Sequence, residues 1–334
     1  MHESVPWHVR RGWIAAQLGL LALIAAPFVL TALDRGYLVP VLTRMLAYGL
    51  AAAALDVVLG YGGLVSFGHG AFLGTGAYVT GVLLHHAGQG TPMLRWPFEI
   101  GGSTDALVAL PAATLAAGAL AFVVGAVSLR TRGVHFIMIT LAFAQMVYFL
   151  VLAIPDYGGT DGLMLPMRNR LADLPLDGDQ PLYWLALVLL MAFLLAARRT
   201  MEARFGLALR GARQNERRMR ALGYPVYRIR LLAFTISGAA AGLAGAVLAN
   251  QAGFVSPDLL SWQRSGELIM MVILGGQGTL FGPVLGAFAL LLLEEELSAV
   301  TEHWMLVLGP ILLACVLCFR RGLWGQVSGA PTHG

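Results

Sequence analysis

Residues 56–78 read DVVLGYGGLVSFGHGAFLGTGAY, and this stretch decides the fold. Two apolar runs meet at a glycine-rich break, which is formed by Gly60, Gly62 and Gly63. The polar residues Ser66 and His69 follow at a position that would lie at membrane depth. Unwound backbone is tolerated inside a bilayer only where it is buried in protein or lines a cavity. The stretch therefore predicts two membrane spans joined by a buried or cavity-lining break.

The rest of the chain has the same apolar character. Of its 334 residues, 58% are hydrophobic and 12% are charged, whereas soluble domains carry about 25% charged residues. A soluble core could not hide so much apolar surface, so the bilayer is the natural solvent. We predict an all-α fold, a polytopic transmembrane helical bundle. Residues 1–334 form one membrane domain with its core at 38–319, because no soluble stretch is long enough to fold separately.

Ten apolar segments can be marked along the chain. They are residues 13–33, 38–59, 64–86, 105–127, 133–154, 181–197, 231–252, 266–277, 280–297 and 303–319. The eighth and ninth are short and interrupted by glycine, so together they can form one broken or re-entrant unit that interrupts a helix in mid-membrane. The sequence therefore predicts about 8 to 10 spans.

Arginine placement predicts the orientation. Basic residues cluster at the N-terminus (Arg10, Arg11), after the fourth segment (Arg130, Arg132), in the loop 198–230 and at the C-terminus (Arg320, Arg321). The loop 198–230 alone holds ten arginines against Glu202 and Glu216. With ten crossings all four regions share one side, which the positive-inside rule assigns to the cytoplasm. Both termini are predicted to be cytoplasmic.

Polar residues within the apolar segments are candidates for the solute path, because intramembrane polar groups are costly. The candidates are Asp56, Ser66, His69, Thr140, Gln145 and Glu267. Each also has a structural interpretation: a capped or paired carboxylate for Asp56, a structural hydrogen bond for His69, and helix–helix hydrogen bonds for Thr140 and Gln145. The sequence leaves these alternatives open.

The loop 198–230 reads as short helical pieces. Gly223 suits a helix C-terminus, and Pro225 cannot continue the helix. A solvated basic anchor would explain the arginines. It would not explain the spaced apolar residues Leu209, Met219 and Leu222, which favour a helix that docks into a groove on a cytoplasmic partner.

We assign no catalytic residue and no metal site. Cys315 and Cys318 lack a second pair that would complete a metal site, so packing within a helix is the favoured interpretation. The chain has no lysine, which excludes the phosphate-binding loop that needs one. Neither a zinc-protease motif nor a nucleophile elbow is present. If ATP drives this system, another chain binds it.

Several of these segments resemble the LivM-type permeases of branched-chain amino-acid ATP-binding cassette importers. The matching pieces span roughly residues 45 to 297, which is most of the chain. They are GYGGLVSFGHGAFLGTGAY, RGVHFIMITLAFAQ, GGTDGL, LGYPVYRIRLLAFTISGAAAGLAGA and VILGGQGTLFGPVLGA. Their order and spacing together are specific, whereas any one of them alone is weak.

The resemblance implies a multi-pass protein of the bacterial inner membrane that works by alternating access, contacts lipid and binds no nucleic acid. Its implied partners are a second permease, two cytoplasmic ATPase subunits that bind ATP and Mg, and a periplasmic solute-binding protein. The loop 198–230 would be the ATPase-coupling loop, with Arg210, Asn215, Glu216, Met219, Leu222 and Gly223 as its site residues. This loop is more basic here than the acidic, alanine-rich family pattern.

The implied substrates are leucine, isoleucine and valine. Permeases for urea, short amides and aromatic or organic acids share these motifs, so they stay open as alternatives. A stand-alone secondary transporter is a further alternative, although it would not need the arginine-rich loop.

Overall fold

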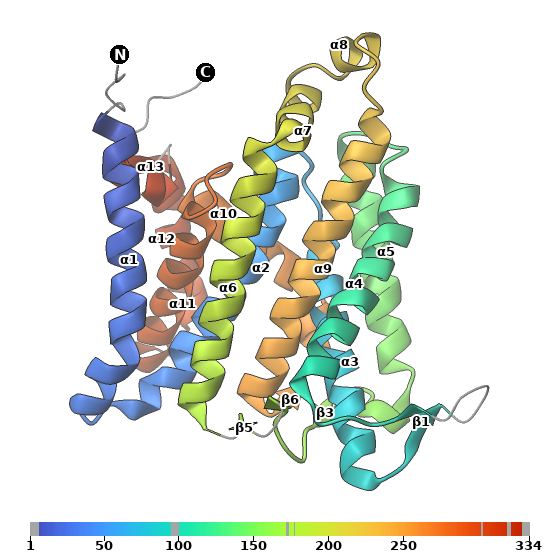
Figure 1. Cartoon of the computed structure of the whole chain (residues 1–334), viewed down its shortest axis with the longest axis vertical. Helices are drawn as coiled ribbons and strands as arrows, with labels where there is room; N and C mark the ends of the chain where they lie inside the picture. Colours follow the sequence, from blue (N-terminus) through green and yellow to red (C-terminus); the bar gives the residue numbers. More distant parts are fainter. Residues whose placement is uncertain are drawn as a thin grey trace.

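The computed structural model describes residues 7–94, 100–171, 174–176, 178–301, 303–318 and 322–328. Within these residues the chain forms a bundle of long helices (Figure 1). The predicted polytopic all-α fold is confirmed. Arg320 and Arg321 lie outside the described residues, as do the side chains of Arg10, Arg11, Cys315 and Cys318.

Six helices in the described part of the chain are long and apolar enough to cross a membrane. They are α1 (Trp7–Ala32), α2 (Val39–Asp56) with its π-helical extension η2 (Val57–Tyr61), α4 (Ala106–Ser128), α5 (Val134–Leu152), α6 (Asp179–Glu202) and α9 (Val226–Ala252). The other four predicted segments are also helical. They are α3 (His69–Gln89), α10 (Trp262–Gly275), α11 (Gly282–Val300) and α12 (Trp304–Cys318). The exact number of crossings stays a prediction.

Shorter elements connect the long helices. The small helices are η1 (Gly36–Leu38), η3 (Pro155–Tyr157), η4 (Pro257–Leu260), α7 (Arg204–Gln214), α8 (Glu216–Ala221) and α13 (Gly322–Ser328). Three antiparallel pairs join β1 (Pro92–Leu94) with β2 (Ile100–Gly101), β3 (Leu163–Met164) with β6 (Phe254–Val255), and β4 (Arg170–Leu171) with β5 (Leu174–Pro175).

Helix α9 lies at the centre of the bundle and packs against α2, α3 and α4. Small residues make this packing close, as is common between membrane helices. A Cβ at Gly242 would collide with Ala117 of α4, and one at Gly245 would collide with the carbonyl of Leu73 in α3. Gly242 and Gly245 of α9 therefore serve helix packing.

The two ends of the bundle differ. Helices α7, α8 and α13 and the start of α1 lie at one end, and β1, β3, β5 and β6 lie at the other (Figure 1). The turn after α4, which carries Arg130 and Arg132, lies at the α7 end as well. This grouping agrees with the predicted clustering of basic regions. That the α7 end faces the cytoplasm stays a prediction.

Candidate functional site

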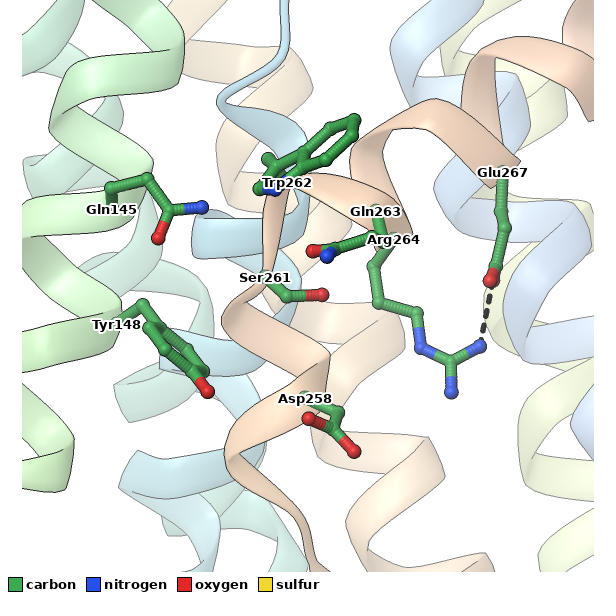
Figure 2. Close-up of a pocket in the computed structure, with 8 residues that line it drawn as sticks. All are labelled: Gln145, Tyr148, Asp258, Ser261, Trp262, Gln263, Arg264 and Glu267. Carbon is green, nitrogen blue, oxygen red and sulfur yellow. Dashed lines mark hydrogen bonds and ion pairs between the residues drawn. The ribbon is translucent and has the colours of Figure 1, made fainter. Parts of the chain in front are cut away.

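A polar pocket of about 320 Å³ lies between α5, η4 and the start of α10 (Figure 2). Gln145 and Tyr148 of α5 form one side, and the chain from Asp258 to Glu267 faces them. Its lining residues are Gln145, Tyr148, Asp258, Ser261, Trp262, Gln263, Arg264 and Glu267. Two predicted path residues, Gln145 and Glu267, thus line one pocket.

The pocket exists because α10 starts late. After α9 ends at Gly253, which adopts a left-handed φ of +62°, the chain continues through β6 and η4 before α10 begins at Trp262. This connecting segment packs along α3, where Leu260 of η4 lies against Gly74. Ser265 then accepts a 2.8 Å hydrogen bond from the backbone N–H of Gly70. Irregular backbone inside a membrane protein is tolerated where it is buried or lines a cavity.

The pocket lies beside one of the long apolar helices. Gln145 is near the middle of the span Val134–Leu152. A polar pocket beside an apolar helix is a candidate solute site, because transporters bind their solutes at polar sites within the helical bundle.

Both signs of charge line the pocket. Arg264 donates from Nη1 to Glu267 Oε2 at 2.6 Å, and these side chains are 27% and 34% exposed. The Asp258 carboxylate makes no hydrogen bond or ion pair with any residue that the structure describes. The pocket therefore offers an uncommitted carboxylate beside a guanidinium that keeps further donors.

Ser66 and His69 lie away from this pocket in closed packing. The His69 ring is fully buried, with Nε2 2.8 Å from Ser237 Oγ and Nδ1 3.2 Å from Ser66 Oγ. Phe72 and Phe234 pack edge-on against the ring. These contacts correspond to the structural interpretation of His69.

Thr140 is also buried and bonded. Its Oγ1 accepts from the backbone N–H of Phe67 at 3.2 Å and donates to the carbonyl of Ile137 at 2.9 Å. Thr140 thereby ties α5 to the segment that precedes α3. It does not line the polar pocket.

Asp56 lies at a contact between two glycine-rich breaks. Its Oδ1 accepts a 2.8 Å hydrogen bond from the N–H of Gly278, while its buried Oδ2 has no hydrogen-bond partner within the described part of the chain. Gly278 belongs to the turn 276–281 between α10 and α11. This turn lies beside the last turn of the α2 span, toward α7, and its expected interruption of a helix in mid-membrane stays a prediction. We call the contact between residues 56–63 and 276–281 the break junction.

The predicted helical pieces of the loop 198–230 are α7 and α8. Asn215 caps α8, because its Oδ1 accepts from the N–H of Arg218 at 3.0 Å. Gly223 ends α8 with a left-handed φ of +82°, and the N–H groups of Gly223 and Tyr224 bond back to Arg220 and Met219. This is a Schellman ending, which favours glycine at that position. The predicted role of Gly223 as a helix terminator is confirmed.

We call α7 and α8 together the helical cap. Glu216 holds this helical cap to the bundle. Its carboxylate pairs with Arg132 at 3.0 Å, with Arg220 at 2.5 Å and with Arg230 at 3.0 Å. Arg132 follows α4 and Arg230 belongs to α9. One half-buried carboxylate therefore joins three segments.

The apolar residues of this region divide into two groups. We expected Leu209 on the basic surface, but it is fully buried against Val57, Met201 and Ala233. Met219 packs on Gly211, which joins α8 to α7. Leu222 is 63% exposed and stays a candidate contact for a partner. The amphipathic spacing of α7 explains why Leu209 points inward.

Arg210 turns back onto the bundle. Its Nη2 donates to the carbonyl of Met201 at 2.8 Å, and its guanidinium lies 5.9 Å from the centre of the Tyr61 ring. It therefore anchors α7 in this conformation.

Sequence reasoning missed Asp258, Arg264 and Tyr148 in the pocket, and Arg213 at the break junction. An available signal was the arginine three residues before Glu267, since i,i+3 pairs lie on one helix face. Arg213 had no such signal among the ten arginines of its loop.

Comparison with known proteins identifies the family. Residues 37–316 match the model of the permease component of branched-chain amino acid transport systems. The chain is 31% identical over 328 residues to the high-affinity branched-chain amino acid permease protein LivM of Escherichia coli K12, covering 91% of this chain and 73% of that protein. The LivM protein of Salmonella typhimurium LT2 is similar to the same extent, at 31% identity with the same coverage.

A more distant relative is the autoinducer 2 import permease LsrC of Photorhabdus laumondii, at 30% identity over 55% of this chain and 56% of that protein. No solved structure matches the chain significantly. The match covers most of the chain and includes the pocket, the break junction and the helical cap. The chain therefore belongs to the family of permease components of branched-chain amino acid transport systems.

Proposed function

We propose that this chain is the permease subunit of an ATP-binding cassette importer that carries leucine, isoleucine and valine across the bacterial inner membrane. It would pair with a second permease, two ATPase subunits that bind ATP and Mg, and a periplasmic solute-binding protein. Support comes from the similarity to LivM over 91% of the chain. No bond chemistry is assigned to this chain, because its relatives are transport components.

The observation that carries the substrate class is the mixed charge of the polar pocket. A free amino acid has an ammonium and a carboxylate, urea and short amides have neither, and organic acids have only the carboxylate. Asp258 offers an anion that has no partner among the described residues, and Arg264 offers a cation whose donors are only partly used by them. We therefore assign the ammonium to Asp258 and the carboxylate to Arg264.

The surroundings of the pocket support a path between two permeases. Helix α5 beside it exposes large apolar side chains, among them Met138, Met146 and Phe149. The pocket is open rather than enclosed, because α5 and the start of α10 border it only in part. A second permease against this face would complete the walls around the solute.

A second candidate substrate class rests on the neutral polar groups of the same pocket. Gln145, Ser261 and Gln263 offer amide and hydroxyl groups, which suit urea or a short amide. A stand-alone carrier is less favoured, because the helical cap would then lack a partner for Leu222.

Uptake of radiolabelled leucine after deletion of the gene tests the proposal, with unlabelled valine and urea as competitors. Loss of leucine uptake that the gene restores and valine competes would establish amino-acid import. Intact leucine uptake would remove the amino-acid assignment and direct attention to urea, amides or organic acids. A reconstituted complex that imports without ATP would contradict the ATP-driven class.

A further inference from the structure

Helix α7 contacts the break junction through Leu209 and Arg210, which lie against Val57 and Tyr61, and through Arg213, which reaches the backbone of the break. The Nη1 group of Arg213 donates a hydrogen bond to the carbonyl of Gly60, the residue at which two apolar spans are interrupted. The aliphatic part of Arg213 covers Gly63, which adopts a left-handed φ of +68°. A Cβ at Gly63 would lie 2.7 Å from Arg213 Cγ, so glycine is needed for this approach.

Beneath Arg213 the two breaks touch directly. Asp56 Oδ1 accepts from Gly278 N–H at 2.8 Å. A Cβ at Gly60 would collide with both the Asp56 carboxylate and the backbone nitrogen of Gly278. The last turn of the α2 span and the turn between α10 and α11 are therefore held together by the Asp56 side chain and by the close approach of the backbone at Gly60 to Gly278.

The carboxyl group at this contact is incompletely hydrogen-bonded. Asp56 is 0% exposed, and its Oδ2 has no hydrogen-bond partner. A buried carboxylate is strongly destabilising unless a cation and hydrogen bonds compensate it. Arg213 is the positive charge that attracts it, yet no ion pair forms between them in this conformation. A guanidinium has five donors, so a small shift of Arg213 would let it reach Oδ2.

Helix α7 is also the element best placed to move Arg213. It packs on α6 and α9 through Leu209, and it is joined to α8, whose end exposes Leu222. A push on the helical cap would therefore displace Arg213 relative to both breaks. Packed contacts of this kind have discrete alternative arrangements rather than continuous ones.

We propose that Arg213 is a positioning residue that transmits movement of α7 to the break junction. In one state its guanidinium donates a hydrogen bond to the Gly60 carbonyl. In the other state it pairs with Asp56 and changes the hydrogen bond between Asp56 and the N–H of Gly278. Because α10 carries Arg264 and Glu267 at its other end, this movement would reach the polar pocket. The inference rests on the proposed function, since an ATP-driven partner must move the helical cap.

The test uses the complete transporter in liposomes, with Arg213→Ala and Arg213→Lys compared with wild type. Arg130→Ala is the matched control, because Arg130 is exposed at the same end and follows α4. Two quantities are measured: leucine imported per ATP hydrolysed, and hydrogen–deuterium exchange of residues 276–282 without nucleotide. The exchange measurement needs no solute, so it tests Arg213 whatever the substrate is.

Arg213→Ala should lower leucine imported per ATP by about fivefold or more while hydrolysis continues. Exchange at residues 276–282 should become faster, because the junction opens locally. Arg213→Lys should restore part of both values, and Arg130→Ala should change neither. Unchanged exchange at 276–282 in Arg213→Ala would overturn the inference, whether or not uptake falls. A wild-type complex that imports no solute with ATP would instead contradict the proposed function.

Discussion

The two ends of α10 are built in opposite ways. At its C-terminal end the turn 276–281 is packed closely, with Gly278 bonded to Asp56 and Gly322 of α13 lying against Gly276. At its N-terminal end the helix begins beside an open pocket of about 320 Å³, which includes the Asp258 carboxylate that pairs with none of the residues described by the structure. One end suits the transfer of movement, and the other suits contact with a small polar solute.

This difference shows what glycine and polar residues each indicate in a membrane sequence. The glycine-rich motifs mark places where backbones touch, because a Cβ at Gly60 or Gly275 would collide with a neighbouring backbone. The pocket has no glycine among its lining residues. Its signal is a set of charged and amide side chains on α5, on η4 and on the first turns of α10.

The largest expected effect comes from adding a side chain at the break junction, beside the C-terminal end of α10. Gly60→Val would force a side chain against the backbone of Gly278, which cannot move aside as a flexible side chain could. We expect a loss of about 3 kcal/mol or more of stability, seen as little monodisperse protein after extraction in detergent. Gly19→Val is the control, because nothing lies within 4 Å of the added Cβ at that position. Equal yields of the two variants would contradict the close packing of the junction.

The next effect concerns the polar pocket at the N-terminal end of α10. Asp258→Asn keeps the size of the side chain and removes the charge proposed to hold the ammonium. The KM for leucine should rise about tenfold or more, as for loss of a charge-assisted hydrogen bond, while assembly stays normal. Asp156→Asn, an exposed carboxylate on η3 outside the pocket, should leave the KM unchanged. An unchanged KM in Asp258→Asn would separate the pocket from the solute path.

A smaller effect is expected in the helical cap. Glu216→Gln weakens the contacts to Arg132 and Arg230, which hold α8 to the bundle. We expect a loss of roughly 1 kcal/mol, measured as a lower thermal unfolding temperature and faster proteolysis between α7 and α9. Glu202→Gln removes only an exposed pair with Arg198 and should have little effect. If both variants behave alike, Glu216 does not anchor the cap.

The smallest effect on activity belongs to labelling variants that define the two ends. Gln214→Cys at the α7 end should react with an impermeant thiol reagent only from the cytoplasm, and Gly178→Cys only from outside. Both positions are exposed. The reverse pattern would invert the assigned orientation of the junction and the pocket.

The sequence predicted the helical bundle well, because its apolar segments and breakers are strong local signals. The glycine-rich breaks, the α8 ending at Gly223 and the pocket-lining residues Gln145 and Glu267 were found in this way. The inward turn of Leu209 was missed, since a basic loop gave no reason to expect buried contacts. Arg213 and Asp258 were missed because their importance comes from tertiary neighbours: Gly60 in one case and the α5 side of the pocket in the other.

The most direct test of the account is a paired measurement of the KM for leucine and of leucine imported per ATP. It compares wild type, Asp258→Asn and Arg213→Ala in the reconstituted transporter. We predict that Asp258→Asn raises the KM without changing leucine per ATP, and that Arg213→Ala lowers leucine per ATP without changing the KM. If both variants change the same quantity, or if neither variant changes either quantity, the account is wrong. The N-terminal end of α10 would then not be specialised for solute binding, nor its C-terminal end for the transmission of movement.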